Sequence, residues 1–184
     1  MQSTRFQGFN FFAAFLLCIP AANWMIGNVG LTCVPGGPCL VPVLPSVMAP
    51  SGVVMIGLAL VLRDLVQRRL GVGWVLVAIL LGTVVSAALA PGALVLASAS
   101  AFLLSELVDF AVYTPLQRRR LVLAVFLSSI AGLVIDSLVF LKLAFGNLDF
   151  LLGQVVGKAW MVLLALPVIW WLRHYELRRG IQPA

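Results

Sequence analysis

The stretch LVLAVFLSSIAGLVIDSLVFLKLA, residues 121–144, decides the fold class of this chain. It is almost wholly apolar, and its only charged residues are Asp136 and Lys142. A helix needs about 20 predominantly apolar residues to cross the hydrocarbon layer of a bilayer. The stretch is therefore predicted to be a membrane-spanning helix.

Five further apolar runs flank it, so we predict six spanning helices in a single transmembrane domain of residues 1–184. They cover approximately residues 8–26, 48–66, 72–90, 93–113, 121–144 and 149–172. Composition agrees, because 62% of the residues are hydrophobic, 10% are charged and the mean hydropathy is +1.13. A soluble domain of this size keeps a large exposed area and could not hide so much apolar surface. We predict an all-α integral membrane protein.

The second run is the least regular. It opens with Pro50-Ser51-Gly52 and ends in Arg63-Asp64, so we expect a short or tilted helix. The first run, residues 8–26, resembles a secretory signal at its end. We interpret it as a spanning helix instead, because its removal would reverse the arginine pattern of the remaining loops.

The arginines predict the orientation. With six crossings all ten arginines fall on one side of the membrane, and the loops on the opposite side carry none. The ten are Arg5, Arg63, Arg68, Arg69, Arg118, Arg119, Arg120, Arg173, Arg178 and Arg179. The positive-inside rule then places both termini in the cytoplasm and the chain in the cytoplasmic (inner) membrane. The net charge of +6 suits anionic lipid headgroups. Nucleic acid is not an expected partner, because no basic face is interleaved with aromatic residues.

Two cysteines bracket a turn-rich stretch of the first outer loop. Cys33 and Cys39 enclose Val-Pro-Gly-Gly-Pro, and they fit either a small disulfide loop or two free thiols. An oxidising outer compartment would favour the disulfide. The third cysteine, Cys18, lies in an apolar run and is expected to be a packing residue.

A set of ionisable residues inside the predicted spans is the most informative feature for function: Glu106, Asp109, Asp136 and Lys158. A charge at the centre of a bilayer costs several kcal/mol, roughly 2.5–3.5 on insertion scales, so such residues face a bundle interior or a polar cavity. They therefore form a functional-site hypothesis, a binding site inside a membrane protein.

Helical spacing groups these residues with others. Asp109 ends a face of small residues at four-residue intervals (Ala97, Ala101, Ser105), and Glu106 lies on the adjoining surface. Paired carboxylates suit a cation, a proton or a ligand rich in N–H donors. The alternative is that both carboxylates reach the headgroups or pair with the arginines at 118–120.

The last two predicted helices repeat the theme. Asp136 shares a face with Phe140, and Gln154 shares one with Lys158, with Trp160 close by. The alternative to a ligand site is a structural ion pair of Asp136 with Lys158 or Lys142. Near the end of the second run, Arg63 and Asp64 form a candidate gate, or equally two solvated charges.

Enzymatic functions are not supported. The only histidine, His174, lies in the arginine-rich tail, so neither a Ser/His/Asp arrangement nor a histidine-based metal cluster can be assembled. The sequence has no Walker phosphate loop and no dinucleotide fingerprint. We predict no enzyme, no catalytic or metal site and no cofactor. Energy for transport would come from a gradient, a downstream trapping reaction or a separate subunit.

Several motifs together resemble the VUT family of queuosine-precursor transporters, the YhhQ-like proteins. They are SELVDF at 105–110 followed by a basic cluster, IDSLVF at 135–140 with AFG at 144–146, Gly157-Lys158 ahead of Pro167, and the segment 60–71 with Asp64 before its glycine. The resemblance covers roughly residues 50–172. Two features depart from the family pattern: Gln67, Arg68 and Arg69 stand where a further acidic residue is usual, and the Cys33 to Cys39 loop is added.

This resemblance implies a six-helix fold similar to the substrate-binding components of energy-coupling-factor vitamin transporters. It also implies uptake of 7-deazaguanine bases such as preQ0 and preQ1. The expected partners are a purine-like small molecule, membrane lipids and, in one variant of the hypothesis, an energising module. The expected substrate site comprises Glu106, Asp109, Asp136 and Lys158, helped by Gln154, Phe140 and Trp160. Two alternatives stay open: a vitamin-binding subunit of an ABC transporter of that type, and a structural or assembly protein of the membrane.

Overall fold

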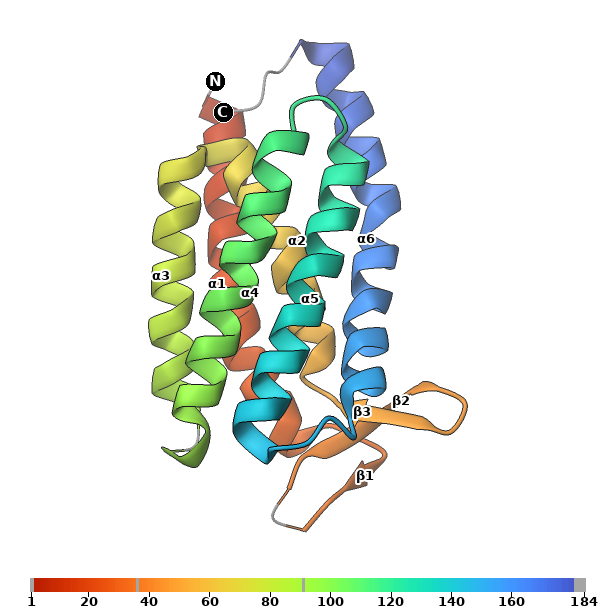
Figure 1. The fold of residues 1–184 in the computed structure, drawn as a ribbon. Helices are drawn as coiled ribbons and strands as arrows, with labels where there is room; N and C mark the ends of the chain where they lie inside the picture. The colour runs from red at the N-terminus through yellow and green to blue at the C-terminus, as the bar shows by residue number, and fades with distance from the viewer. Residues whose placement is uncertain (1, 36, 91, 181–184) are drawn as a thin grey trace.

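The protein is a bundle of six helices with a small sheet at one end, seen in a computed structural model that describes residues 2–35, 37–90 and 92–180 (Figure 1). The helices are α1 (Gln2–Asn28), α2 (Val53–Leu70), α3 (Val72–Leu89), α4 (Val95–Leu116), α5 (Leu121–Phe145) and α6 (Leu151–Arg179), with a short 3-10 turn at Gly92–Leu94. All but α2 are long and apolar enough to cross a membrane. The prediction of an all-α membrane protein is confirmed.

Helix α2 is the exception because it carries four charged residues, Arg63, Asp64, Arg68 and Arg69. It contacts each of the other five helices, and in Figure 1 it lies behind α4 and α5. A charged helix is tolerated in a membrane protein when the bundle surrounds it. The run that looked least regular in the sequence is thus the central helix of the fold.

The bounds predicted for three helices need correction. Helix α1 begins at Gln2, before the predicted start at residue 8. The second run was expected at 48–66, but its first residues form a strand and the helix begins at Val53. Pro50 explains the late start, since the residue before a proline avoids helical angles, and the hydroxyl of Ser51 donates to the carbonyl of Met25 at 2.7 Å. Helix α6 continues to Arg179, beyond the predicted end at 172, and this extension carries arginines past the apolar run.

The small sheet has three antiparallel strands, β1 (Thr32–Cys33), β2 (Cys39–Leu44) and β3 (Val47–Pro50), in that order. Cys33 and Cys39 lie opposite each other in β1 and β2 and are joined by a disulfide. The sequence analysis did not predict this sheet. Prolines in its strands hid the signal, because a proline cannot donate to a ladder and reads as a break.

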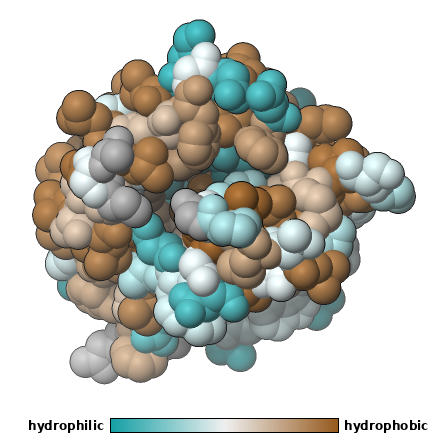
Figure 2. Space-filling model, turned by 90° about the horizontal axis from the view of Figure 1, so that it is seen from below, coloured by the Kyte–Doolittle hydropathy of each residue, from teal (hydrophilic) through white to brown (hydrophobic). Residues whose placement is uncertain are grey.

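The sheet packs against the beginning of α6. A side chain at Gly153 would collide with the carbonyl oxygen of Met48. Farther along α6, the indole nitrogen of Trp160 donates to the carbonyl of Val43 at 2.9 Å. We call this end of the bundle, shown in Figure 2 with mixed hydrophobic and hydrophilic residues, the sheet end. The opposite end, where α1 begins and α6 finishes, is the arginine end (Figure 1).

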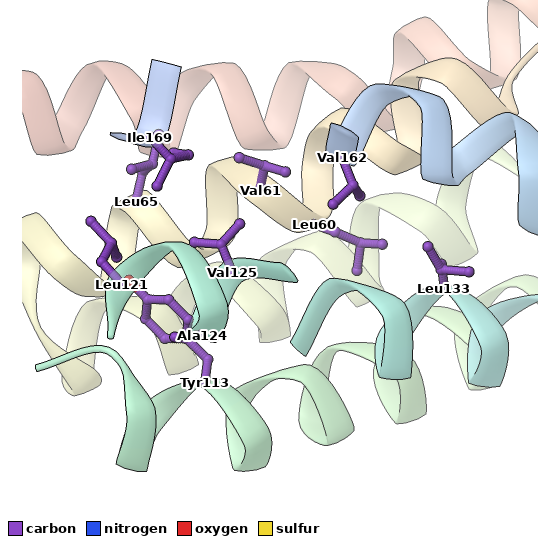
Figure 3. Packing of buried hydrophobic residues seen from close by; sticks show 10 residues of the cluster. All are labelled: Leu60, Val61, Leu65, Tyr113, Leu121, Ala124, Val125, Leu133, Val162 and Ile169. Carbon is purple, nitrogen blue, oxygen red and sulfur yellow. The ribbon is translucent and has the colours of Figure 1, made fainter. Parts of the chain in front are cut away.

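Two apolar clusters fill the bundle, and α2 contributes to both. The cluster between α2, α4, α5 and α6 is shown in Figure 3 and comprises Leu60, Val61, Leu65, Tyr113, Leu121, Ala124, Val125, Leu133, Val162 and Ile169. The other joins α1, α2, α3 and α4 and comprises Phe15, Cys18, Ile19, Ala59, Val66, Val75, Ala78, Ile79 and Phe102. Many large apolar side chains also point outward, such as Leu80 and Val84 of α3, as expected of a surface that faces lipid.

Replacing Gly57 with alanine should destabilise the protein. The added Cβ would lie 2.5 Å from the carbonyl oxygen of Lys158, where α2 crosses α6, and such overpacking costs about 1–3 kcal/mol. Gly73→Ala is the matched control, since a Cβ added there would meet nothing within 4 Å. Thermal unfolding in detergent checks this, and equal melting temperatures for the two variants would contradict the tight crossing.

Candidate functional site

The most buried charges of the molecule gather around one arginine. Arg63 of α2 contacts three carboxylates, those of Asp64, Glu106 and Asp109, and we call these four residues the Arg63 cluster. None of the four side chains is more than 2% exposed. The neighbours Asp64 and Arg63 come from α2, whereas the other two carboxylates come from α4. The cluster therefore ties the central helix to α4.

The guanidinium divides its nitrogens among these partners. Its Nη2 lies 2.9 Å from Oδ1 of Asp64 and also contacts Oδ1 of Asp109. Its Nε lies 3.2 Å from Oε2 of Glu106. Glu106 thus has the longest of the three ion pairs.

Neutral polar groups complete the surroundings of the cluster. The Nη1 of Arg63 donates to Oε1 of Gln67 at 3.3 Å, and Gln67 donates in turn to the hydroxyl of Thr114 at 2.9 Å. Ser128 of α5 donates to Oδ2 of Asp64 at 3.1 Å. The ring of Tyr113 lies 5.6 Å from the guanidinium carbon, within the range of a cation–π contact.

A glycine brings α5 close to this cluster. An added Cβ at Gly132 would lie 3.2 Å from the Cβ of Asp109 and 3.1 Å from a methyl carbon of Leu60. Small residues at such positions allow close helix approach in membranes. The small-residue face that the sequence predicted on α4 is also buried, through Ala97, Ala101 and Ser105.

A second cluster surrounds Lys158 of α6. Its ammonium lies 2.5 Å from Oδ2 of Asp136, 2.7 Å from the hydroxyl of Ser137 and 2.8 Å from Oε1 of Gln154. We call these four residues the Lys158 cluster. It joins α5 to α6, and one lysine balances one carboxylate. The Asp136 side chain is 14% exposed, which makes it the most accessible charged group of the two clusters.

The two clusters lie at different depths in the bundle. Asp136 lies roughly 12 Å along α5 from Ser128, nearer the sheet end, at 1.5 Å per residue. Glu106 precedes Asp109 on α4 and is likewise nearer the sheet end. The charges of Glu106 and Asp136 are close enough to repel one another. Glu106 is therefore the electrostatic link between the clusters.

A third set of ion pairs closes the arginine end. Arg68 holds both oxygens of Glu176 and donates to the carbonyl of Gln117 at 3.2 Å. Arg69 contacts the same carboxylate at 2.8 Å. These contacts join α2 to the end of α6 and to the link between α4 and α5. The sequence analysis had placed both arginines among the headgroup-facing charges and had given Glu176 no role.

Two alternatives from the sequence analysis are wrong. Arg63 and Asp64 are not solvated charges, because both side chains are 0% exposed. Glu106 and Asp109 do not reach the headgroups or pair with the arginines at 118–120, because their partner is Arg63. The two candidate gate residues and the two α4 carboxylates, considered separately in the sequence, belong to one cluster.

The other predicted site residues divide into two groups. Asp136, Lys158 and Gln154 come together, and Lys142 instead donates to the carbonyl of Gly146 at 3.4 Å. The structure does not bring the two aromatic candidates to the charged groups. Phe140 packs edge-on against Phe145 at 6.0 Å between ring centroids, and Trp160 is 48% exposed beside the sheet.

Sequence reasoning missed the neutral side chains that hold the charges, namely Gln67, Thr114, Ser128 and Ser137. One signal was available, since Gln67 follows Arg63 by one helical turn and shares its face. Ser128 and Thr114 gave no such signal, because their partners lie on other helices.

The arrangement suits reversible polar binding more than catalysis. Both clusters hold hydrogen-bond donors beside acceptors inside an apolar bundle. Within each cluster the donors and acceptors contact one another. Across the described residues, no three His, Cys, Asp or Glu side chains are placed to hold a metal ion. A groove lined by Leu138, Val139, Lys142, Leu143 and Leu148 is apolar and includes neither cluster.

Comparison with known proteins gives one match. Residues 85–172 match the model of a family described as "putative vitamin uptake transporter". The matched part contains Glu106, Asp109, Asp136 and Lys158, whereas Arg63 lies outside it. That family consists of transporters, which are not enzymes and which act on small-molecule substrates. No protein of curated function and no solved structure was found to match.

Removing the charge of Arg63 should destabilise the bundle strongly. In Arg63→Met three buried carboxylates lose their shared cation, and breaking a buried ion pair from one side costs about 3–5 kcal/mol. Adding Glu106→Gln and Asp109→Asn should recover part of that loss, because fewer unpaired charges remain. Arg118→Met, at an exposed position, is the control. Thermal unfolding in detergent gives the comparison, and a single variant as stable as the control would refute the central role of Arg63.

Proposed function

We propose that this chain is an uptake transporter of the cytoplasmic membrane whose substrate is a queuosine precursor, a 7-deazaguanine base of the preQ0 or preQ1 type. The observation that carries the proposal is the Lys158 cluster, a set of convergent polar groups buried in helices that match a vitamin uptake family. The narrower substrate assignment rests on the sequence motifs around Asp109, Asp136 and Lys158.

The chemistry of the Lys158 cluster fits the edge of such a base. A guanine-like base presents N–H groups and an exocyclic amine, which a carboxylate accepts in a bidentate manner. It also presents a carbonyl oxygen, to which an ammonium or an amide can donate. Asp136 would serve the first role, and Lys158 with Gln154 the second. Sites matched in this way discriminate strongly against analogues that lack the donors.

On binding, polar groups of the Lys158 cluster would exchange their partners within the protein for groups of the base, and the number of buried charges would not change. In the structure described above, Lys158 holds Asp136, Ser137 and Gln154. A base could insert between the ammonium and the carboxylate and satisfy both. The partial exposure of Asp136 supports a first contact at that residue, while Glu106 and Asp109 would line the deeper end of the path.

The orientation belongs to the same proposal. The arginine end would face the cytoplasm, with both termini, by the positive-inside rule. The sheet end would face outward, and its disulfide between Cys33 and Cys39 suits an oxidising compartment. The substrate would then enter from the sheet end, close to the Lys158 cluster.

A vitamin-binding subunit that relies on a separate energising module is the second candidate, since the matched family is described by vitamin uptake. Copurification with ATPase subunits, or uptake that stops in their absence, would favour it. The alternative of a purely structural membrane protein attributes both clusters to helix packing, and the variants below separate it from transport.

Asp136→Asn should abolish uptake of the precursor. The neutral side chain keeps the size of aspartate but cannot accept a bidentate pair of N–H donors, and a loss of at least about tenfold corresponds to 1.4 kcal/mol of binding. The measurement is queuosine in tRNA of cells that cannot synthesise it, supplied separately with preQ0 or preQ1. Asp149→Asn, an exposed loop position, is the control.

A second readout separates transport from a structural role. The double variant Asp136→Asn with Lys158→Gln removes both charges, so no unpaired charge remains to unfold the bundle. If the residues bind substrate, this variant stays folded in the membrane and inactive, and preQ0 or preQ1 raises the melting temperature of the unaltered protein. Normal uptake by Asp136→Asn would sink the assignment of this site.

The orientation can be tested with the two loop cysteines. In intact cells a membrane-impermeant thiol reagent should label Cys33 and Cys39 only after reduction, because the disulfide lies at the sheet end. Cys18, a buried thiol of α1, should stay unlabelled in both conditions and serves as the internal control. Labelling only after the cells are broken open would reverse the proposed orientation.

A further inference from the structure

The Arg63 cluster is not electrically balanced. It contains three carboxylates, Asp64, Glu106 and Asp109, against one guanidinium, so it carries two excess negative charges when all groups are ionised. The Lys158 cluster, by contrast, has one charge of each sign. An isolated charge in a low-dielectric interior is so costly that the group binds a proton instead.

No other cation in the described part of the chain compensates this excess. The titratable and charged groups that face the cluster are Asp64, Arg63 and Arg68 from α2, Glu106, Asp109 and Tyr113 from α4, and Asp136 from α5 with its partner Lys158 from α6. Lys158 is bound to Asp136, and Arg68 is bound to Glu176. Among the described residues, Arg63 is therefore the cation left for the three carboxylates.

The hydrogen-bond pattern of the cluster indicates that a carboxyl group in it carries a proton. Within the described residues, Oδ2 of Asp109 is buried and has neither a hydrogen bond nor an ion pair. Oε2 of Glu106 and Oδ1 of Asp109 meet Arg63 as ion pairs, and neither contact forms a well-aligned hydrogen bond. The hydroxyl of Tyr113, whose ring lies against Arg63, is fully buried and has no partner either. Buried acceptors without donors are rare in folded proteins, and a proton on a carboxyl group would turn one of these acceptors into a donor.

Geometry singles out Glu106 as the proton carrier. Its contact with Arg63 is the longest of the three, at 3.2 Å, and it lies one helical turn from Asp109, a second carboxylate held by the same guanidinium. Asp64 receives a hydrogen bond from Ser128 in addition to its ion pair. Asp64 and Asp109 both contact Nη2 of Arg63, and two carboxylates at one site can share a single proton.

A metal ion is the weaker explanation for the excess charge. No metal-binding group of three acidic, histidine or cysteine side chains is found among residues 2–35, 37–90 and 92–180. Arg63 also stands between the carboxylates and would repel a cation at that position. A proton needs no coordination shell and can bind one carboxylate alone.

We infer that Glu106 is a proton-binding site and that the transporter couples proton movement to uptake of its substrate; the coupling, but not the proton site, rests on the proposed function. A proton entering from the sheet end would meet Asp136 and then Glu106. Its arrival would weaken the hold of Glu106 on Arg63 and end the repulsion of Asp136. Release of the proton toward the arginine end would restore the contact of Glu106 with Arg63 and the repulsion between Glu106 and Asp136. Protonation of Glu106 would thus affect both clusters at once.

Infrared spectroscopy of membranes containing the full-length protein tests the proton site without any substrate. We expect a band from a protonated, buried carboxyl group at pH 7, and its partial loss in Glu106→Gln. Asp149→Asn should leave the band unchanged, because that carboxylate is exposed and lies outside the cluster. Absence of the band in the unaltered protein, or an unchanged band in Glu106→Gln, overturns the inference.

A pH series of melting temperatures provides the second measurement. If the folded state holds protons that the unfolded chain has released, stability falls as pH rises. The melting temperature of the unaltered protein should therefore drop between pH 6 and pH 9 by more than that of Glu106→Gln, which mimics the protonated form. Equal slopes for the two proteins would count against a proton on Glu106.

Liposomes containing the protein and a pH-sensitive dye test the coupling, with preQ0 as the probe because it has no basic amine. With the unaltered protein we expect the entry of preQ0 to acidify the lumen. With Glu106→Gln we expect no such acidification. Entry without acidification overturns the coupling and leaves the proposed function intact. No entry of preQ0 or preQ1, together with a positive infrared band, overturns the proposed function and supports the proton site.

Discussion

The arrangement of the bundle depends on the ion pairs of Arg63. In lipid no water is available to solvate a guanidinium or a carboxylate, so these groups must meet inside the protein. Arg63 draws Asp64, Glu106 and Asp109 to one point and so fixes α2 at the centre, against α4. A buried ion pair adds little net stability, since desolvation offsets the attraction. Its consequence here is specificity: a helix with α2's charges has only one acceptable place in the bundle.

Packing around α2 follows from that constraint. Lipid tails are as apolar as leucine, so helices in a membrane associate through close contact rather than through water exclusion. Glycines supply this contact where α2 meets α6 at Gly57, where α5 meets α4 at Gly132, and where the sheet meets α6 at Gly153. Gly57 and Gly153 have no room for a methyl group, and at Gly132 one would fit only if its neighbours moved slightly. The same contacts set the height of Lys158 and Asp109, so the close packing also positions the charged groups.

The sequence predicted the spans well because the length and polarity of an apolar run are local properties. It could not predict which cation meets which carboxylate, because two of the three partners of Arg63, Glu106 and Asp109, lie on another helix far away in the sequence. The ten arginines of the chain made the matter harder: the positive-inside pattern accounts for Arg118 as readily as for Arg63, although the first is exposed and the second fully buried. The sheet was missed since its prolines broke the strand pattern. Lys158 and Asp136 were recognised because neither can reach a membrane surface from its place in an apolar run.

The different charge balance of the two clusters suggests different tasks. The Lys158 cluster is neutral as a unit, so the proposed binding of a neutral polar base there would leave the buried charge unchanged. The Arg63 cluster has excess negative charge and is closed to solvent, so protons are the ligands that relieve it at least structural cost. Glu106 belongs to the second cluster and is repelled by Asp136 of the first. A proton on Glu106 would therefore remove a repulsion that acts on the carboxylate of Asp136, the group proposed to accept N–H donors from a base. Substrate binding and proton binding would then favour each other through this one repulsion, without any longer chain of contacts.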